Sequence, residues 1–360
     1  MQPIPCVLMR GGTSKGPVFL ASDLPSVTAE RDELLLAIMG SGHELEIDGI
    51  GGGSPQTSKV AIVSPSSHPD ADVDYLFVQV MVSQRRVDTA PNCGNMLCAV
   101  GPFAVEQGLV QATGDLTQVR IRNLNTGTFV CSDVHTPGGR VSYEGQTRID
   151  GVPGVAAPVQ LTFLDAAGSK TGALFPTGNQ TDFFAGIPVT CIDMAMPMVI
   201  VEASLLGKRG DETPAELDAD KEFLCQLELL RLRAGLAMGL GDVSEKVIPK
   251  PVLVSRPGAG GTVKVRYFMP HSCHRALAIT GSIGIATACV SEGTVVAQML
   301  GSADGTRLSQ VRIEHPSGSI QVALSYVGEN GQTIRASVVR TARRLFSGVV
   351  YAPAPQLLAG

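Results

Sequence analysis

The sequence predicts an α+β fold built from two similar domains, and three observations support this. The chain has 360 residues, more than one hydrophobic core usually holds, so we expect two domains. Short β-branched runs alternate with turn residues, and few segments have helical periodicity, which is typical of a strand-rich mixed fold. Two windows of 16 residues carry no charge, 90–105 and 276–291, and they lie at matching places in the two halves. We therefore expect one buried helix in each half.

The first half is expected to alternate strands with two helices. Leucines at helical spacing predict an amphipathic helix at 29–39, and β-branched runs predict the strands. The uncharged window supplies the buried helix. In order, the expected elements are a strand at 6–9, a helix at 29–39, strands at 58–64 and 73–82, a helix within 90–105 and a strand at 118–122.

The second half is expected to repeat this series. Its clearest helical periodicity lies at 221–238, where apolar residues recur among charges. In order, the expected elements are a strand at 189–193, a helix at 221–238, strands at 245–255 and 262–268, a helix within 276–291 and a strand at 319–324.

Residue spacing within the two halves supports a repeat. Met9 and Cys93 are 84 residues apart, and Ala195 and Thr280 are 85 apart. Lys59 follows Met9 by 50 residues, as Lys246 follows Ala195 by 51. A period this long indicates two similar domains rather than a solenoid of short repeats. Chance agreement between common strand–helix patterns is the alternative.

Composition excludes several classes of function. The net charge is −5, aromatic residues make up 4% and Trp is absent, so neither a basic field nor stacking platforms favour nucleic acid. The first residues have no secretory signal, and both uncharged windows are too short and too polar to span a bilayer. The eight cysteines contain no C-x-x-C pair, as expected of free thiols. We expect a soluble cytoplasmic protein that binds neither nucleic acid nor membrane.

The turns that open the uncharged windows predict an anion-binding site. Asn92-Cys93-Gly94-Asn95 and Thr280-Gly281-Ser282 place small residues and free backbone N–H groups at helix N-termini. Two such ends facing each other across a cleft between the domains would hold a small di- or tricarboxylate. The same field favours the thiolate of Cys93.

Two other segments allow more than one interpretation. The segment 10–16, Arg-Gly-Gly-Thr-Ser-Lys-Gly, lacks the spacing of a phosphate loop. It fits either a pocket-lining turn, with the Thr13 and Ser14 hydroxyls, or a plain tight turn. Lys59 follows a glycine-rich run and begins an apolar strand, so it is either a partly desolvated general base or a solvated strand end. The first interpretation requires Lys59 to meet Cys93.

Cys93 is the most reactive candidate in the chain. Its Gly and Asn neighbours place it on a turn, whereas Cys98 and Cys289 lie on expected apolar helix faces. A Cys-dependent hydrolase that pairs Cys93 with His271 or His274 is conceivable, although no oxyanion or orienting motif accompanies them. The crowded cluster 271–275 makes a poor metal site, and we expect no metal.

The combined motifs resemble the diaminopimelate epimerase-like superfamily. Within it the sequence is most similar to the PrpF-like branch, and there to the 4-oxalomesaconate tautomerase/isomerase group. The resemblance covers nearly the whole chain, and the motifs are specific as a set. They are 9–16 (Met-Arg-Gly-Gly-Thr-Ser-Lys-Gly), 47–52, 57–61, 92–95, 178–179, 315–318 and 340–346 (Arg-Thr-Ala-Arg-Arg-Leu-Phe).

The resemblance implies two pseudo-symmetric α/β domains, each a curved sheet around a central helix, with the active site between them. The first domain would be 1–183 plus a returning segment 338–360, and the second 184–337. Family members move a proton across an allylic system without a cofactor, in substrates such as oxalomesaconate from aromatic-acid degradation, methylaconitate or aconitate. A homodimer is expected only because such assemblies are common.

The resemblance also assigns site residues. Lys59 and Cys93 match the catalytic lysine and cysteine, and we expect one to remove a proton and the other to return it, with the order of roles open. The expected substrate-binding residues are Ser14, Thr57, Ser58, Asn92, Gly94, Asn95, Met196, His271, Ser272, Arg275, Thr280, Gly281 and Ser282.

Two positions depart from the family pattern. Thr280 stands where the epimerases have a second cysteine, which favours a lysine–cysteine isomerase over a two-thiol epimerase. Within 191–197, Met and Ala stand where Asn and Gly are expected in oxalomesaconate enzymes, which leaves the exact substrate open. A non-catalytic carboxylate-binding protein and the Cys-dependent hydrolase remain as alternatives from other classes.

Overall fold

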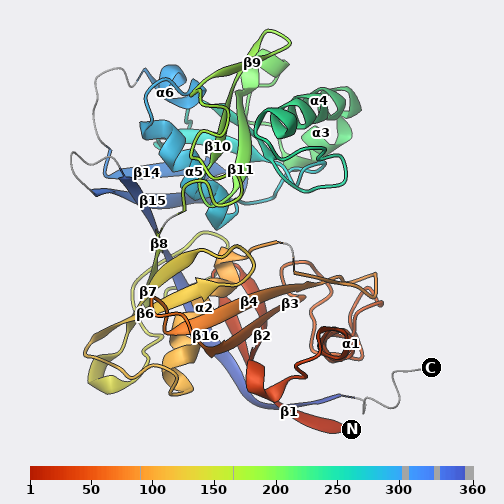
Figure 1. The fold of residues 1–360 in the computed structure, drawn as a ribbon, viewed down its shortest axis with the longest axis vertical. Coiled ribbons are helices and arrows are strands. Elements are labelled where there is room, and N and C mark those ends of the chain that lie inside the picture. Colours follow the sequence, from red (N-terminus) through yellow and green to blue (C-terminus); the bar gives the residue numbers. More distant parts are fainter. Residues whose placement is uncertain (90, 165, 302–307, 328–332, 353–360) are drawn as a thin grey trace. The chain divides into compact units, whose positions relative to one another are not determined.

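The computed structural model describes all residues except 90, 165, 302–307, 328–332 and 353–360 (Figure 1). The chain divides into two compact units, Met1–Leu161 with Val339–Gly360, and Thr162–Val338. Ala90, at the start of the first uncharged window, and the end of the expected returning segment 338–360 lie outside the described residues.

The first unit contains a curved sheet in the order β1-β2-β3-β4-β6-β7. Antiparallel pairs alternate with the parallel pairs β2–β3 and β4–β6. The elements are β1 (Gln2–Gly11), β2 (Ser14–Leu20), α1 (Thr28–Met39), β3 (Lys59–Pro65), β4 (Val73–Val80), β5 (Val87–Asp88), α2 (Gly94–Glu106), β6 (Leu116–Asn123), β7 (Phe129–His135) and β8 (Pro158–Leu164), whose end continues into the second unit.

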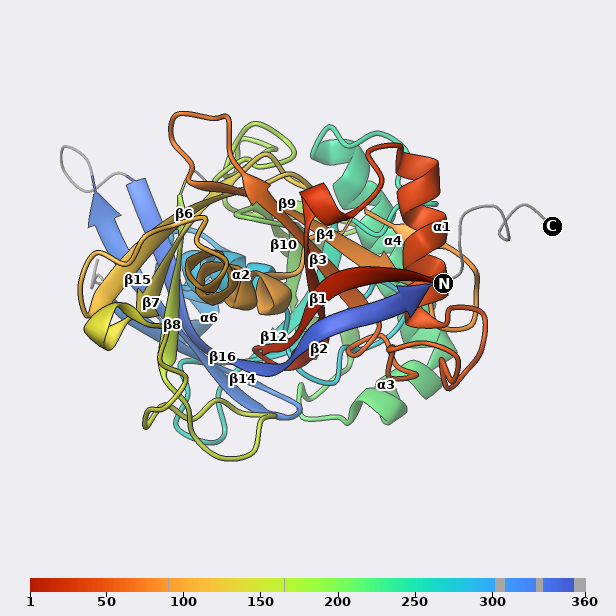
Figure 2. The same cartoon turned by 90° about the horizontal axis from the view of Figure 1, so that it is seen from below.

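Helix α2 is the centre of the first unit. It contacts β1, β2, β3, β4, β6 and β7, and Figure 2 shows it nearly end-on with these strands around it. Its residues from Met96 to Ala104 are buried, as the uncharged window predicts for a helix enclosed on all sides. Helix α1 instead packs against β4 and β5, with Leu34, Leu35 and Ile38 in a separate apolar cluster.

The second unit repeats this plan in the order β9-β10-β11-β12-β13-β14-β15. The buried helix α5 contacts β10, β14 and β15, while α4 packs against β11 and β12. The elements are β9 (Asp182–Phe184), β10 (Ile187–Asp193), β11 (Pro197–Glu202), α3 (Pro214–Ala219), α4 (Lys221–Ala237), β12 (Lys250–Ser255), β13 (Val263–Tyr267), α5 (Ile279–Val290), α6 (Val295–Leu300), β14 (Gln310–His315) and β15 (Gly318–Val327).

Strand β16 (Thr333–Ala352) belongs to both units. Its residues 333–338 pair with β15, and its residues 342–352 pair with β1. The shared order of strands and helices confirms the predicted α+β fold of two similar halves, each with a sheet around one central helix.

One predicted strand begins later than expected. Residues 245–249 form a turn and loop, and β12 starts at Lys250. The carbonyl groups of Lys246 and Ile248 accept hydrogen bonds from Arg231 instead of a neighbouring strand, and Pro249 has no N–H to donate.

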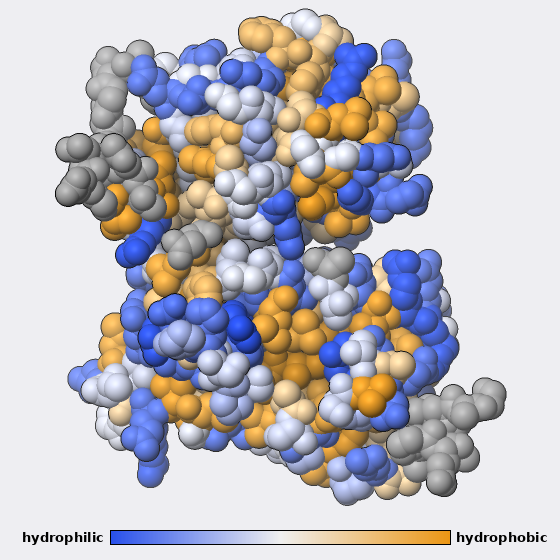
Figure 3. All heavy atoms as spheres, viewed as in Figure 1, coloured by the Kyte–Doolittle hydropathy of each residue, from blue (hydrophilic) through white to orange (hydrophobic). Residues whose placement is uncertain are grey.

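The visible surface is mixed in character. Figure 3 shows apolar patches broken up by polar side chains on each unit. Large exposed apolar residues are also spread along the sequence, for example Ile47, Phe183 and Leu236. Among the described residues, no helix is both long and apolar enough to cross a membrane.

Candidate functional site

The structure brings Lys59 and Cys93 together in the first unit. The Lys59 Nζ lies 3.7 Å from the Cys93 Sγ, within hydrogen-bonding distance for sulfur. The two residues are 34 positions apart in sequence and come from different elements, the start of β3 and the start of α2. The requirement set by the sequence, that the lysine meet the cysteine, is therefore met.

Neighbouring residues of β4 fix the lysine. Gln79 pairs with Lys59 across the sheet, and its Oε1 accepts a hydrogen bond of 3.1 Å from the Lys59 Nζ. The Gln79 amide nitrogen donates to the carbonyl oxygens of Ser58, Pro55 and Val80, so its oxygen is turned toward the lysine. The Nζ also lies 5.0 Å from the centre of the Phe77 ring, a favourable position for a cation.

Cys93 is the N-cap residue of α2 and is only 8% exposed. The first intrahelical bond runs from Leu97 N to Cys93 O, so the N–H groups of residues 94–96 stay outside the helical ladder. The Tyr75 hydroxyl also donates to Cys93 O at 3.2 Å. Burial, with the nearby Cys93 sulfur, raises the pKa of Tyr75, so the phenol stays protonated as a donor. The thiol thus sits at the positive end of a buried helix.

A glycine turn between β1 and β2 lies against this helix end. Gly12 has a φ of +52°, and a Cβ there would overlap the Asn95 side-chain oxygen. Asn95 donates to the Thr13 hydroxyl at 3.1 Å and accepts from Thr13 N at 3.4 Å. At Gly16 a Cβ would overlap the Lys59 carbonyl oxygen. Both glycines allow the turn and strand to approach Lys59 and the start of α2.

The other predicted residues of the first unit differ in whether their side chains form hydrogen bonds within the described part of the protein. Ser14 begins β2, is 3% exposed, and its hydroxyl makes no hydrogen bond within the described part of the chain. The Ser58 hydroxyl is bound to the buried carboxylate of Glu46, and the Thr57 hydroxyl to Ser54. Asn92 accepts from the Asn123 amide at 2.7 Å. Gly94 is the first residue of α2, directly after the thiol.

In the second unit, Thr280, Gly281 and Ser282 lie in the first turn of α5. All three are buried, and a Cβ on Gly281 would press into the Tyr267 ring. The Ser282 hydroxyl donates back to Ile279 O at 2.7 Å, whereas the Thr280 hydroxyl has no hydrogen bond among the described residues. Thr280 is therefore the free side chain of this helix end.

The remaining predicted residues of the second unit lie on loops. His271 is 65% exposed, with its Nδ1 3.7 Å from a Glu228 carboxylate oxygen, and Ser272 accepts from Met269 N through its carbonyl. Arg275 is exposed, and its carbonyl accepts from the Ser317 hydroxyl.

Met196 lies in the turn between β10 and β11 and is partly buried. Its neighbour Ala195 has a φ of +62°, in the left-handed region that glycine adopts easily. This is the segment in which the sequence departs from the glycine expected in oxalomesaconate enzymes.

Strand register identifies a residue that the sequence comparison of the halves missed. Leu20 and Glu202 each precede a short 3-10 helix, and they pair with Val63 and Val254 in the parallel neighbour strands. Four residues before each of these valines lies a lysine that begins its strand, Lys59 in β3 and Lys250 in β12.

Lys250, rather than Lys246, is thus the second-unit counterpart of Lys59. Lys246 lies on the loop, where its Nζ donates to Leu240 O. The signal was present in the sequence, because both Lys59 and Lys250 precede four apolar residues in a row. Spacing from Ala195 favoured Lys246, because its 51 residues are closest to the 50 that separate Met9 and Lys59.

Lys250 is a buried cation. It is 5% exposed, and within the described residues its Nζ makes no hydrogen bond or ion pair. Its parallel neighbour Met198 reaches Gly284 of α5, so Lys250 lies on the same α5-facing side of the sheet. Burial, with repulsion from Arg231, lowers the pKa of Lys250 to about 8.

Metal-binding side chains do not cluster in the described residues. No group of three or more His, Cys, Asp or Glu side chains within them is arranged to hold a metal ion. None of the eight cysteines, all of which are described, forms a disulfide, and the Cys93 sulfur contacts a lysine.

Sequence and structure comparisons agree with one another. The sequence matches the family described as PrpF protein over residues 1–353. It is 63% identical to the putative isomerase YbhH of Escherichia coli strain K12, over 98% of this chain and 100% of that protein. It is 52% identical to the 4-oxalomesaconate tautomerase of Pseudomonas putida, over 96% of this chain and 95% of that protein. The crystal structure of a methylitaconate-delta-isomerase matches with a TM-score of 0.87 at 36% identity, covering 100% of this chain and 97% of that one.

Proposed function

Because the chain belongs to the PrpF family, we propose that it is an isomerase that moves a carbon–carbon double bond in a small unsaturated di- or tricarboxylate. The 52% identity to a 4-oxalomesaconate tautomerase favours 4-oxalomesaconate as the substrate, with methylaconitate or aconitate as the alternative within the family. The observation that carries the proposal is the 3.7 Å approach of Lys59 and Cys93.

The proposed reaction is a 1,3-proton shift that uses this pair. One of the two groups, as amine or thiolate, removes a proton from the carbon next to the unsaturated system. The electron pair delocalises into a dienolate, and the other group returns a proton to the far carbon, so the composition does not change. The free N–H groups at the start of α2 are suited to stabilise the negative charge that develops.

We assign roles to the predicted binding residues according to whether their polar groups already have hydrogen-bond partners among the described residues. Ser14 and Thr280 have free hydroxyls, and Asn92, Gly94 and Asn95 surround the thiol. Gly281 and Ser282 would contribute backbone N–H groups at the start of α5. We assign Thr57 and Ser58 to supporting the Lys59 strand, because their hydroxyls are bound within the protein.

Incubation of the protein with a panel of unsaturated tricarboxylates in deuterated water tests the proposal. Proton NMR should show one compound shifting its double bond and incorporating deuterium at the allylic carbon. Lys59→Met and Cys93→Ser should lose this activity, and Cys225→Ser, at an exposed cysteine, should keep it. Binding without exchange would indicate a carboxylate-binding protein, and a mass adduct on Cys93 a hydrolase.

A Cys-dependent hydrolase receives less support from the geometry. The described partner of the Cys93 sulfur is an amine rather than an imidazole. His274, one of the two candidate bases, accepts a hydrogen bond from Ala276 N through its Nδ1.

We also propose that the protein works in the cytoplasm as a homodimer. Eight cysteines without a disulfide are suited to a reducing compartment, and dimers are the commonest assemblies of soluble oligomers. Light scattering on the purified protein would test the dimer, which a mass near 37.5 kDa would exclude.

A further inference from the structure

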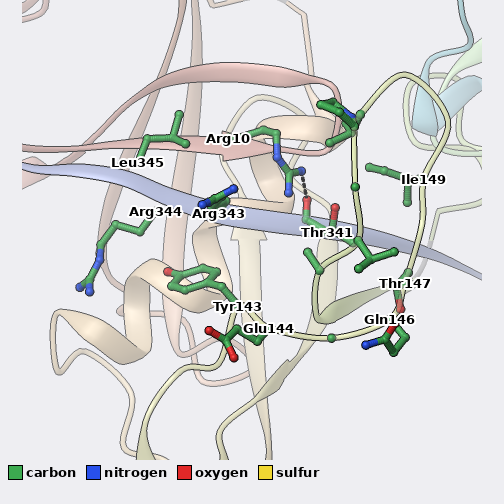
Figure 4. Close-up of a pocket in the computed structure, with 16 residues that line it drawn as sticks. Arg10, Tyr143, Glu144, Gln146, Thr147, Ile149, Thr341, Arg343, Arg344 and Leu345 are labelled. Carbon is green, nitrogen blue, oxygen red and sulfur yellow. Dashed lines mark hydrogen bonds between the residues drawn. The ribbon is translucent and has the colours of Figure 1, made fainter.

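A pocket in the first unit has a lining that includes neither Lys59 nor Cys93. It has a volume of about 640 Å³, within the usual range for small-molecule sites. Its walls are the end of β1, the segment 143–156 and residues 341–345 of β16, as Figure 4 shows. Three arginines and one glutamate line it: Arg10, Arg343, Arg344 and Glu144. The charge of the lining is therefore positive.

Arg10 and Arg343 form an unfavourable pair. They are directly opposite each other in the antiparallel ladder between β1 and β16, so their side chains lie on the same face. Like charges at such positions repel each other. Burial, with the charge of Arg343 adding to it, lowers the pKa of Arg10. Two neighbouring guanidinium groups at these positions therefore destabilise the folded protein relative to one guanidinium group.

Neither cation is neutralised within the described residues. The Arg10 Nη1 donates only to neutral carbonyl oxygens, that of Gly12 at 2.9 Å and that of Thr341 at 2.7 Å. Figure 4 shows the bond to Thr341. The Arg343 side chain has no hydrogen bond or ion pair with any residue that the structure describes. Arg344, by contrast, is paired with Glu106 at 3.3 Å. The pocket thus contains two guanidinium groups available to a ligand.

The rest of the lining suits an organic ligand. Thr147 and Gln146 supply polar groups, and Ile149, Val152 and Leu345 supply apolar surface. A small oxyanion with a hydrocarbon skeleton would meet both kinds of surface, whereas an inorganic anion would use only the polar part. Carboxylates also match the forked geometry of guanidinium donors.

Arg10 connects this pocket to the catalytic residues. Its Nη1 holds Gly12 O, and Gly12 N donates to Thr341 O at 2.9 Å. Gly12 packs against Asn95, which lies two residues after Cys93 at the start of α2. An anion that fixes Arg10 would also fix this glycine turn.

We propose that the pocket is a second anion site, in which a small organic di- or tricarboxylate bridges Arg10 and Arg343 and orders the glycine turn beside Cys93. The site is separate from the proposed isomerase reaction and uses neither Lys59 nor Cys93. Binding to it would act on the catalytic turn through Arg10, so the two sites would be energetically coupled.

Calorimetric titration with tricarballylate, a saturated tricarboxylate without a double bond to move, tests the site. The wild-type protein should bind two equivalents, one in each site, and Arg343→Gln should bind one. Arg335→Gln, at an exposed arginine elsewhere on β16, is the matched control and should bind two. Equal stoichiometry and affinity in Arg343→Gln and the wild type would overturn the proposal.

Three further readouts separate the site from general effects of the substitution. Without ligand, Arg343→Gln should melt at the same temperature as the wild type or higher, because it removes a repulsion. A lower melting temperature would mean that Arg343 is a structural residue and would contradict the site. Inorganic phosphate should bind more weakly than tricarballylate, and equal or tighter phosphate binding would overturn the assignment to an organic anion.

The coupling has its own test. Hydrogen exchange of the peptide 9–16 should slow more on tricarballylate addition in the wild type than in Arg343→Gln. Equal protection in both proteins would contradict the coupling. Because Arg343→Gln retains Lys59 and Cys93, its isomerase activity without added anion should equal that of the wild type, so failure of the second site leaves the proposed function untouched.

Discussion

Lys250 begins β12 at the position where Lys59 begins β3, but only Lys59 has a cysteine at the start of the neighbouring central helix. Helix α2 follows Cys93, whereas α5 follows Ala278. The second unit therefore has a lysine at this position without a cysteine at the start of its central helix. A buried ammonium without a proton-transfer partner is suited to hold a substrate carboxylate.

Lys250→Met should have opposite effects on stability and on substrate binding. The free energy of unfolding at pH 7 should rise by about 3 kcal/mol, because lowering the pKa from 10.5 to about 8 corresponds to an unfavourable buried charge of about that size. The KM for the tricarboxylate should rise about tenfold or more, with a smaller change in kcat. Denaturant unfolding and steady-state kinetics measure the two effects.

The stability difference should depend on pH in a defined direction. The unfolded chain holds the Lys250 proton up to a pH near 10.5, and the folded chain only up to about 8. Wild-type stability should therefore rise between pH 8 and 10.5, and the advantage of Lys250→Met should shrink over that window. Lys246→Met, on the neighbouring loop, is the control. A less stable Lys250→Met with unchanged KM would contradict the carboxylate role.

Isotope exchange should distinguish the roles of Lys59 and Cys93. Lys59→Met and Cys93→Ser should each lower kcat about a thousandfold or more, because each removes one end of the proton shift. If Lys59 is the base, Cys93→Ser should still exchange the allylic proton of the substrate with deuterated water, and Lys59→Met should not. If Cys93 is the base, the two results should be reversed. Near-normal turnover in either variant would remove that residue from the reaction.

Gln79 should act as a positioning residue for Lys59. Gln79→Leu removes the oxygen that accepts from the Nζ, so the Lys59 amino group loses its fixed direction. We expect kcat to fall about 10–100-fold with little change in KM, since small displacements of reacting groups reduce rates by such factors. Gln79→Glu, which keeps an acceptor, should recover part of the loss. Equal activity in Gln79→Leu and the wild type would contradict the role.

Gly12→Ala should impair activity more than a comparable substitution elsewhere. The alanine would carry the strain of a positive φ, roughly 1–2 kcal/mol, and would also overlap Asn95. Gly108→Ala is the matched control, because Gly108 has a φ of +71° and no atom within 4 Å of the added Cβ. Melting temperature should fall in both variants, and kcat should fall only in Gly12→Ala. Equal kcat in both would show that the turn does not support the site.

The elements that sequence predicted best are those defined by local composition. An uncharged run of this length favours burial on all sides, so 90–105 and 276–291 predicted α2 and α5. Leucine spacing likewise predicted α1 and α4 to within a few residues. These signals lie within single segments and need no knowledge of the partners across the sheet.

The details that sequence missed depend on partners distant in the chain. The start of β12 is set by Arg231, which takes up the carbonyl groups of the preceding loop. The orientation of Lys59 depends on Gln79, and the hydroxyl of Ser58 is occupied by Glu46. None of these side-chain pairs follows from periodicity, because residue spacing does not specify which strands become neighbours.

Strand β16 also sets the order in which the protein can be completed during synthesis. Residues 342–352 pair with β1 on the edge opposite β2, and the whole second unit lies between these two strands in the sequence. The first unit must therefore wait with an open sheet edge while the whole second unit is made. Because one strand completes both sheets, the two halves should gain their full stability only after residues 333–352 have been made.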